Sequence, residues 1–117
     1  MLTWNIRNLI IMNIRHKFNA IRTEVDEIKF ASKKEAEYYT QLRKTIYSDK
    51  NPEGTLLFFL RQVPLDLPGG IKYICDFVLF NLDGSVHFID VKGYLTKEFK
   101  LKRKLVEKTY PFKLELV

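Results

Sequence analysis

The stretch that most constrains the fold runs from residue 71 to residue 92 and reads IKYICDFVLFNLDGSVHFIDVK. Two runs rich in β-branched and aromatic residues flank the turn-forming tetrapeptide at residues 81–84, which predicts a β-hairpin. A three-residue loop at 82–84, with Gly84 in the left-handed conformation, places Asp76 directly opposite Asp90. A two-residue loop would shift this pairing by one position, so the register depends on the loop that forms.

Alternation along each strand decides which side chains share a face of the sheet. On the first strand this rule groups Asp76 with Ile74 and Val78. The second strand directs one set of side chains to one face, namely Val86, Phe88, Asp90 and Lys92. It directs the other set to the opposite face, namely His87, Ile89 and Val91.

Two opposed carboxylates between apolar strands need a physical explanation. Like charges directly opposite each other cost about 0.2–1 kcal/mol, and burial raises that cost. A divalent cation bound between Asp76 and Asp90 removes the repulsion, since carboxylate oxygens are preferred ligands of Mg²⁺. Lys92 lies on the same face as Asp90, where its ammonium group would stabilise a phosphate or position a water. The alternative is that Asp76 is a surface residue at a strand end and that residues 90–92 form a solvated edge.

A helix is predicted from Ser32 to about Tyr47. Ser32 is a favourable N-cap, and Glu35 stands at the third helical position, which makes a capping box. The apolar stripe consists of Tyr39, Leu42 and Ile46 at helical spacing. Glu35 precedes Tyr39 by four residues and therefore lies on the same stripe. Its carboxylate either caps the helix or reaches the predicted metal site.

The remaining elements follow from similar patterns. Residues 23–30 are compatible with a small ribbon before the helix, and residues 56–67 form the first strand of a meander. Pro64 interrupts the hydrogen-bond ladder of that strand and places it at an edge or a bulge, with Gln62 a weaker candidate for the active groove. A second helix, capped by Thr96, runs to about residue 109, and residues 112–117 form a last strand. The order predicts an α/β fold in which a helix precedes a three-strand antiparallel meander, and a helical crossover leads to the last strand of a mixed central sheet.

The second helix has a basic side and an apolar side. The apolar side consists of Phe99, Leu101, Leu105, Val106 and Tyr110. The basic side consists of Lys97, Lys100, Lys104 and Lys108. A stripe of this kind is usually a solvated face. The helix begins soon after Lys92, however, so a nucleic-acid backbone at the metal site would meet Lys97, Lys100 and Lys104. Arg15 and Lys17 are candidates for a second phosphate-contacting arm, or else belong to a solvated loop.

Composition narrows the class of protein. The formal net charge of +6 favours a polyanionic partner. Cys75 is the only cysteine, which excludes an internal disulfide and predicts a buried thiol. No apolar run approaches the roughly 20 residues of a membrane span, so a cytosolic protein without a membrane partner is expected. Residues 1–14 are predicted to be an accessory segment that packs on the body or on a second subunit, and residues 15–117 to be a single domain.

Several segments of the sequence resemble motifs of the PD-(D/E)xK nuclease superfamily. Asp76, followed fourteen residues later by Asp90-Val91-Lys92, is similar to its bipartite signature, although Cys75 replaces the usual proline. The segments SKKEAEYY at 32–39, YICDFVLF at 73–80 and DVKGYLTKEFKLKRKL at 90–105 resemble a small nuclease-like family common in bacteriophages and mobile elements. The resemblance covers roughly residues 15–117.

This resemblance implies a restriction-endonuclease-like core and a Mg²⁺- or Mn²⁺-dependent DNA endonuclease. Asp76 and Asp90 would bind the metal with the Val91 carbonyl, and Glu35 would contribute directly or through water. In-line attack would leave a 5′-phosphate. Structure-specific or weakly selective cleavage is expected, such as Holliday-junction resolution or trimming during DNA recombination, in the host cytoplasm if the protein is phage-encoded. A non-catalytic nucleic-acid-binding module with the same fold and an oligomerising structural protein are the alternatives, and a homodimer is left open.

Overall fold

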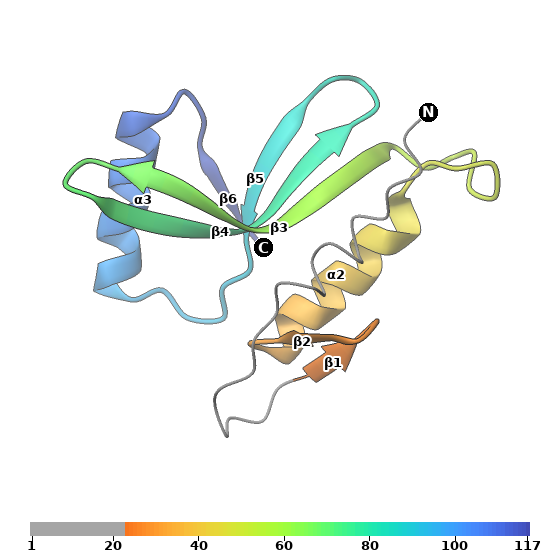
Figure 1. Ribbon diagram of the computed structural model, residues 1–117, viewed down its shortest axis with the longest axis horizontal. Coiled ribbons are helices and arrows are strands. Elements are labelled where there is room, and N and C mark those ends of the chain that lie inside the picture. Colours follow the sequence, from red (N-terminus) through yellow and green to blue (C-terminus); the bar gives the residue numbers. More distant parts are fainter. Residues whose placement is uncertain (1–22) are drawn as a thin grey trace. The chain divides into compact units, whose positions relative to one another are not determined.

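The computed structural model describes residues 23–117, which divide into two compact units on either side of the boundary between Lys44 and Thr45 (Figure 1). The elements, in chain order, are β1 (Thr23–Val25), β2 (Ile28–Phe30), α2 (Lys33–Thr45), β3 (Leu56–Leu67), β4 (Ile71–Asn81), β5 (Val86–Asp90), α3 (Lys97–Thr109) and β6 (Leu114–Leu116). The predicted accessory segment and the candidate residues Arg15 and Lys17 lie outside the described residues. Treating residues 15–117 as one domain stays a prediction.

The first unit joins a two-stranded ribbon to helix α2. Strands β1 and β2 are antiparallel, and Asp26 and Glu27 between them have positive φ angles of 52° and 65°, as a tight two-residue turn requires. The hydroxyl of Tyr39 donates to Asp26 Oδ2 at 3.0 Å and ties the helix to this turn. The predicted ribbon is therefore confirmed.

Helix α2 begins where the sequence predicts. The backbone N–H of Glu35 donates to the Ser32 hydroxyl at 3.1 Å, which confirms Ser32 as the N-cap. Tyr39 and Leu42 are buried as expected. Ile46 lies beyond the last helical residue, Thr45, and bridges to β3 instead, so the helix is slightly shorter than predicted.

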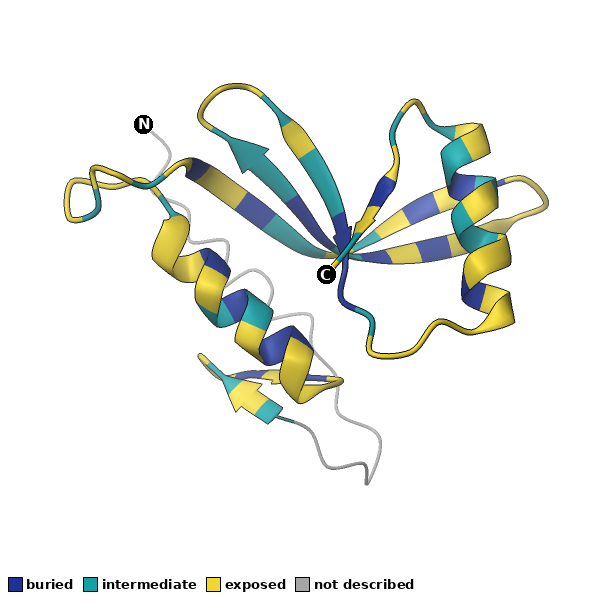
Figure 2. Ribbon diagram, turned by 180° about the vertical axis from the view of Figure 1, so that it is seen from behind, coloured by how far each residue is buried: buried dark blue, intermediate teal, exposed yellow. Residues whose placement is uncertain are grey.

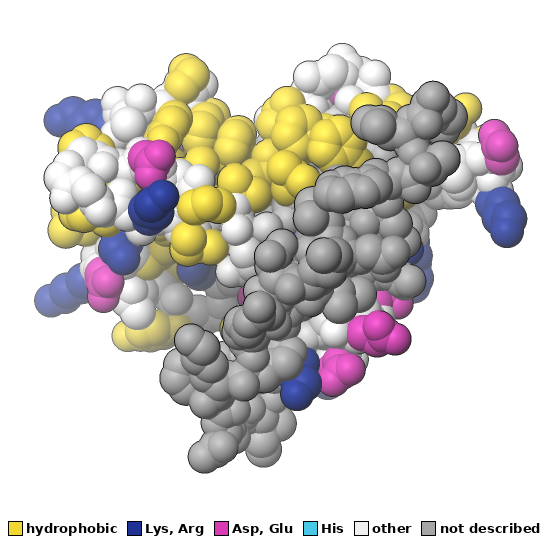
Figure 3. All heavy atoms as spheres, viewed as in Figure 1, with side chains coloured by type: hydrophobic (Ala, Val, Ile, Leu, Met, Phe, Trp, Pro, Cys, Tyr) yellow, Lys and Arg dark blue, Asp and Glu magenta, His cyan; other side chains and the backbone are white. Residues whose placement is uncertain are grey.

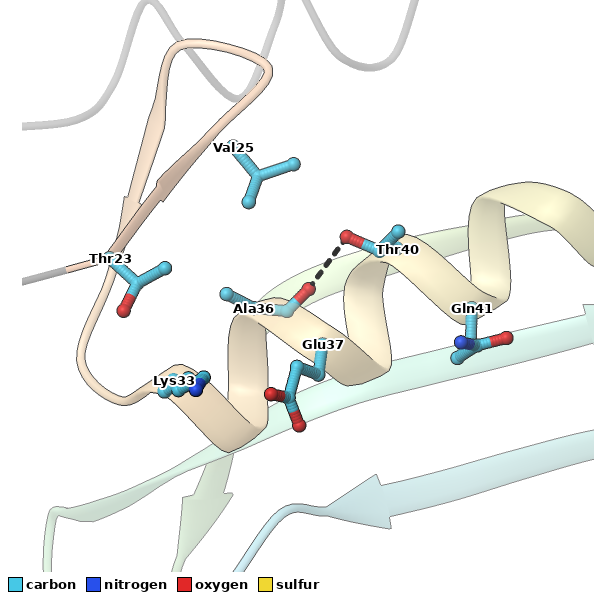
Figure 4. Close-up of a pocket in the computed structure, with 7 residues that line it drawn as sticks. All are labelled: Thr23, Val25, Lys33, Ala36, Glu37, Thr40 and Gln41. Atoms are coloured by element: carbon cyan, nitrogen blue, oxygen red, sulfur yellow. Dashed lines mark hydrogen bonds between the residues drawn. The ribbon is translucent and has the colours of Figure 1, made fainter.

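A shallow pocket of about 200 Å³ lies between the ribbon and the first half of α2 (Figure 4). Seven residues line it, namely Thr23, Val25, Lys33, Ala36, Glu37, Thr40 and Gln41. The Thr40 hydroxyl already donates to the Ala36 carbonyl at 3.0 Å. A single carboxylate and a single ammonium on its rim do not make a catalytic or metal-binding cluster.

The second unit is built on a four-stranded sheet in the order β3-β4-β5-β6. The first three strands form an antiparallel meander, and β6 pairs in parallel with β5 after the α3 crossover. The predicted mixed α/β topology is therefore confirmed. Pro64 lies in β3, an edge strand of this sheet, as predicted.

The central hairpin has the three-residue loop. The N–H of Asn81 donates to the Ser85 carbonyl at 3.0 Å, and Gly84 has a φ angle of 89°. Phe77 pairs with Ile89 in the ladder, so the next position along places Asp76 opposite Asp90. Glycine is needed at residue 84 because other residues strongly disfavour that conformation.

Helix α3 covers one face of this sheet. The Thr96 hydroxyl accepts from the N–H of Phe99 at 3.0 Å, which confirms the predicted N-cap. Phe99 and Val106 are buried in one cluster, whose other fully buried members are Leu65, Leu67, Tyr73, Cys75, Val78 and Leu114. Leu101 was predicted to lie on the apolar side of the helix, but 62% of it is exposed. The buried face of α3 is therefore narrower than the predicted apolar side.

The side chains of β3 and β4 change face in the middle of each strand. The cluster residues of β4 are Tyr73 and Cys75, then Val78, so the spacing switches from two to three. Ile74 is 45% exposed while Val78 is 3% exposed. The prediction that Val78 shares a face with Ile74 was therefore wrong, because the strand does not alternate regularly between Cys75 and Val78.

The same interruption occurs on β3. Gln62 has a φ angle of 52°, and it is missing from a ladder in which Arg61 pairs with Phe77 and Val63 with Cys75. Figure 2 shows buried and exposed residues mixed along both strands. The irregularity therefore falls at Gln62 and Asp76, which lie across from each other.

Exposed apolar side chains remain on the sheet. Figure 3 shows hydrophobic side chains gathered above the strands, and Leu57, Leu82 and Val86 are 51%, 47% and 43% exposed.

Neither helix in residues 23–117 is long and apolar enough to cross a membrane.

Candidate functional site

Asp76 and Asp90 form a pair that is held together by the backbone of each other's strand. The N–H of Asp76 donates to Asp90 Oδ1 at 3.2 Å, and the N–H of Val91 donates to Asp76 Oδ2 at 2.9 Å. Each carboxylate therefore lies across the β4–β5 junction. The two negative charges predicted from the hairpin register are brought together.

Asp90 is the more deeply buried member, with 0% of its surface exposed. Its Oδ2 accepts a hydrogen bond from the hydroxyl of Tyr73. Burial raises the pKa of Asp90 above its ordinary value of 3.8, and the Tyr73 hydrogen bond opposes that rise. The pKa of Tyr73 is raised as well, first by its own burial and then by Asp90, so Tyr73 stays a neutral donor.

Asp76 is only partly buried and is approached from β3. Gln62 Nε2 lies 3.4 Å from Asp76 Oδ1, which is a long hydrogen bond. The left-handed backbone of Gln62 is a conformation that costs a non-glycine residue about 1–3 kcal/mol. Gln62 therefore lies beside Asp76, and its place in an active groove stays a prediction.

The segment from Asp90 to Lys92 is fixed by the end of the chain. Val117 donates its N–H to the Asp90 carbonyl at 3.0 Å and accepts from the N–H of Lys92 at 3.2 Å. Val91 directs its N–H the other way, toward Asp76. An extended residue directs its N–H and C=O to the same edge, so the Val91 carbonyl is expected on the side of the carboxylates.

Lys92 is partly buried two residues beyond Asp90. Its ammonium nitrogen lies 4.6 Å from the centre of the Phe99 ring, a cation–π contact that holds it over the first turn of α3. A pocket of about 300 Å³ adjoins it. The side chain is therefore positioned at the mouth of an open cleft.

Cys75 precedes Asp76 and is fully buried. Its thiol is close to the carbonyl oxygens of Phe77 and Ile89, at 3.4 and 3.5 Å. Burial raises the pKa of Cys75 to about 12, so the thiol is not a nucleophile. The predicted role as a small buried residue is confirmed.

The other candidates are not brought to this pair by a described contact. Glu35 belongs to the first unit, where only 6% of it is exposed. Its contribution to the carboxylate pair stays a prediction. The lysines Lys97, Lys100, Lys104 and Lys108 are exposed on α3.

Sequence reasoning missed Tyr73 and the lysines Lys72 and Lys102. Tyr73 lies three residues before Asp76, but its hydroxyl reaches Asp90 because β4 changes face between them. The helical periodicity of α3 placed Lys100 and Lys104 on its basic side and left Lys102 out. Lys102 is nevertheless the helix lysine that lines the pocket beside Lys92. A pattern of alternating residues contains no signal for either arrangement.

The role of Tyr73 is testable. Tyr73→Phe is expected to lower the free energy of unfolding by about 1.5–3 kcal/mol, because a buried charged acceptor loses its donor. The same change in an Asp90→Asn background is expected to cost less. Denaturant unfolding of the single and double variants gives this coupling.

Tyr94→Phe is the control for these variants, because Tyr94 is 80% exposed. It is expected to leave the free energy of unfolding unchanged. Equal costs of Tyr73→Phe in both backgrounds would show that the hydroxyl does not act through Asp90.

The carboxylate oxygens of Asp76 and Asp90 are suitable ligands for a hard divalent cation such as Mg²⁺ or Mn²⁺. An ionised carboxylate has about four acceptor positions, and two described hydrogen bonds occupy each of Asp76 and Asp90. Among residues 23–117, no three His, Cys, Asp or Glu side chains converge as a metal-binding group. Within the second unit, a complete ligand set would therefore need the Val91 carbonyl or water.

Comparison with known proteins places the chain in a family without a known activity. No curated protein and no solved structure matched it. One family model matches residues 15–117, nearly the whole chain, and its description is "Protein of unknown function (DUF1064)". The chain belongs to the DUF1064 family.

Proposed function

We propose that this protein is a Mg²⁺- or Mn²⁺-dependent DNA endonuclease that hydrolyses phosphodiester bonds. The observation that supports this proposal most directly is the pair of Asp76 and Asp90. Backbone hydrogen bonds hold the two carboxylates together across β4 and β5, and Asp90 is completely buried. A buried like-charged pair lowers stability and is therefore unexpected unless the site has a use for it. Lys92 follows on the same segment and adds a cation at the edge of the cleft.

The sequence pattern supports this proposal. Asp76 and Asp90-Val91-Lys92 resemble the PD-(D/E)xK signature, and the observed order of a helix, an antiparallel meander, a helix and a parallel last strand agrees with the core expected from that resemblance. Cys75 stands where the signature usually has proline, and it is fully buried.

Each residue then has a defined task. Asp76 and Asp90 would hold the cation, while Tyr73 and the two strand N–H groups keep their oxygens oriented. A bound divalent cation supplies water activation and polarisation of the phosphate. Lys92 would orient the attacking water and offset negative charge that develops on the phosphate.

Glu35 has more than a capping role in this proposal. The ground for this role is the resemblance of the segment at 32–39 to the nuclease-like family. We assign the Glu35 carboxylate to the metal site, either directly or through water.

The substrate is assigned by charge. The net charge of +6 favours a nucleic acid, and Lys97, Lys100 and Lys104 stay predicted phosphate contacts on the exposed side of α3. Structure-specific or weakly selective cleavage, of the Holliday-junction type or in recombination, is the form of activity we propose.

The direct test incubates branched, duplex and single-stranded DNA with the protein in Mg²⁺, Mn²⁺ or EDTA. Cleavage with either cation and none in EDTA is the expected result. DNA binding without cleavage of any substrate would instead favour the alternative, a non-catalytic binding module that retains this fold.

Glu35→Gln separates capping from metal binding. Glutamine keeps hydrogen-bonding capacity at the third helical position but removes the charge. The variant is expected to melt at or above the wild-type temperature without metal, to gain less stability when Mn²⁺ is added, and to cleave poorly. Thermal unfolding with and without Mn²⁺ measures the first two effects.

Glu37→Gln is the matched control, because Glu37 is exposed two residues further along the same helix. It is expected to behave as wild type. Wild-type cleavage and an unchanged Mn²⁺ shift in Glu35→Gln would reduce Glu35 to a helix cap.

A further inference from the structure

A basic pocket lies next to the carboxylate pair, within the second unit. Eight residues line its volume of about 300 Å³, namely Lys72, Tyr73, Ile74, Lys92, Thr96, Glu98, Phe99 and Lys102. They come from the start of β4, the segment after β5 and the first turns of α3. Three lysines and a single glutamate make this pocket electropositive.

The ammonium groups of Lys72 and Lys102 are engaged only by exposed partners. Lys72 Nζ lies 3.2 Å from Asp66 Oδ1, and Lys102 Nζ lies 3.3 Å from Glu98 Oε1. The side chains of Asp66 and Glu98 are 81% and 77% exposed. Surface pairs of this kind contribute about 0–1 kcal/mol, so an anionic ligand replaces the carboxylate partner at little cost.

The pocket is continuous with the candidate site through two of its lining residues. Tyr73 donates its hydroxyl to Asp90, and Lys92 is two residues from Asp90. Figure 3, viewed as in Figure 1, shows Lys and Arg side chains on the side where α3 and the β3–β4 hairpin lie. An anion held by Lys72 and Lys102 therefore lies beside the carboxylates, on the side marked by Lys92.

We infer that this pocket binds a backbone phosphate of the nucleic-acid strand next to the bond that is cut. This inference rests on the proposed function for its substrate class. Lysine binds phosphate as a flexible point charge, and the open, mixed lining suits a strand that passes through rather than an enclosed small molecule. Next to the cut bond, the strand is thereby assigned to the Lys72–Lys102 side of α3, and the phosphates predicted to contact Lys100 and Lys104 lie farther along the DNA.

The test compares two double variants in a DNA-binding titration at several salt concentrations in EDTA. Each phosphate contacted on duplex DNA contributes about −0.9 to the slope of log K against log salt. Because Lys72 and Lys102 share one phosphate, Lys72→Ala with Lys102→Ala is expected to lower the magnitude of that slope by about 0.9. Lys100→Ala with Lys104→Ala, the matched control from the same helix, is expected to lower it less.

Several results would overturn the inference. They are an unchanged slope in the Lys72/Lys102 variant, an equal or larger change in the control, and no DNA binding by wild type. Lys72→Arg with Lys102→Arg is expected to restore the slope, and thermal unfolding checks that each variant is folded. Inorganic phosphate that binds at constant ionic strength in a Lys72/Lys102-dependent way, while the DNA slope is unaffected, would make the ligand a free phosphate and not a strand.

Failure of the nuclease proposal has a different signature. Wild-type protein that never cleaves DNA with Mg²⁺ or Mn²⁺, yet shows the expected slopes, would leave the phosphate pocket in place and remove the catalysis. DNA cleavage by the wild type together with an unchanged slope in the Lys72/Lys102 variant would support the nuclease proposal and remove the phosphate pocket.

Discussion

Replacing Asp90 with asparagine is expected to abolish DNA cleavage while DNA binding stays near the wild-type level. Asparagine keeps the shape of the side chain and still accepts from the Asp76 N–H, but it removes a charge from the pair. Metal-assisted stabilisation is worth several kcal/mol, so the rate is expected to fall by about a thousandfold. Steady-state cleavage and DNA titration on the same preparation measure both quantities.

The same substitution is expected to raise metal-free stability near neutral pH. The pKa of Asp90 is raised by burial, so the folded protein holds its proton more tightly than the unfolded chain. The cost of the charge appears as the pH rises above the ordinary value of 3.8 and is complete above the raised pKa. Below both values the carboxyl is neutral in both states, and the advantage of asparagine is expected to vanish.

Asp49→Asn is the control, because Asp49 is exposed in the loop after α2. It is expected to leave cleavage unchanged and to show no comparable pH-dependent stability gain. An Asp90→Asn variant that retained more than about a tenth of the wild-type rate would be inconsistent with a metal ligand at this position.

Lys92→Ala is the second substitution with a large expected effect. The ammonium held over Phe99 is proposed to act on charge that develops during the reaction, and removal of one such group typically costs about 10²–10³ in turnover. Metal affinity is expected to change little, since Lys92 donates no ligand. Turnover and Mn²⁺ titration calorimetry together separate these two properties.

Lys50→Ala is the control for that change, since this lysine is exposed in the loop after α2 and does not line the pocket. It is expected to leave turnover nearly unchanged. Loss of Mn²⁺ binding in Lys92→Ala, or lost stability beyond the roughly 0.5–1 kcal/mol of an exposed cation–π contact, would make Lys92 a structural residue.

The central hairpin could be predicted because its information is local. A turn with glycine at residue 84 and β-forming runs on both sides predicted the hairpin, and the three-residue loop, one of the two considered, places Asp76 opposite Asp90. The N-caps at Ser32 and Thr96 were predictable for the same reason, since a cap depends on residues within one helical turn.

The surroundings of the pair could not be predicted, because they depend on an irregularity shared by two strands. The left-handed backbone of Gln62 and the change of face after Cys75 decide that Tyr73, rather than Ile74, belongs to the side of Asp90. Glutamine carries no intrinsic preference for that conformation. Regular alternation consequently gave the wrong face for Val78.

Mn²⁺ titration calorimetry of the wild type, Asp76→Asn and Asp90→Asn tests most directly whether the carboxylate pair is a divalent-cation site. Wild type is expected to bind Mn²⁺, and each substitution to weaken binding by more than about tenfold, or about 1.4 kcal/mol. Absence of Mn²⁺ binding by the wild type, or equal affinity in all three proteins, would contradict that assignment.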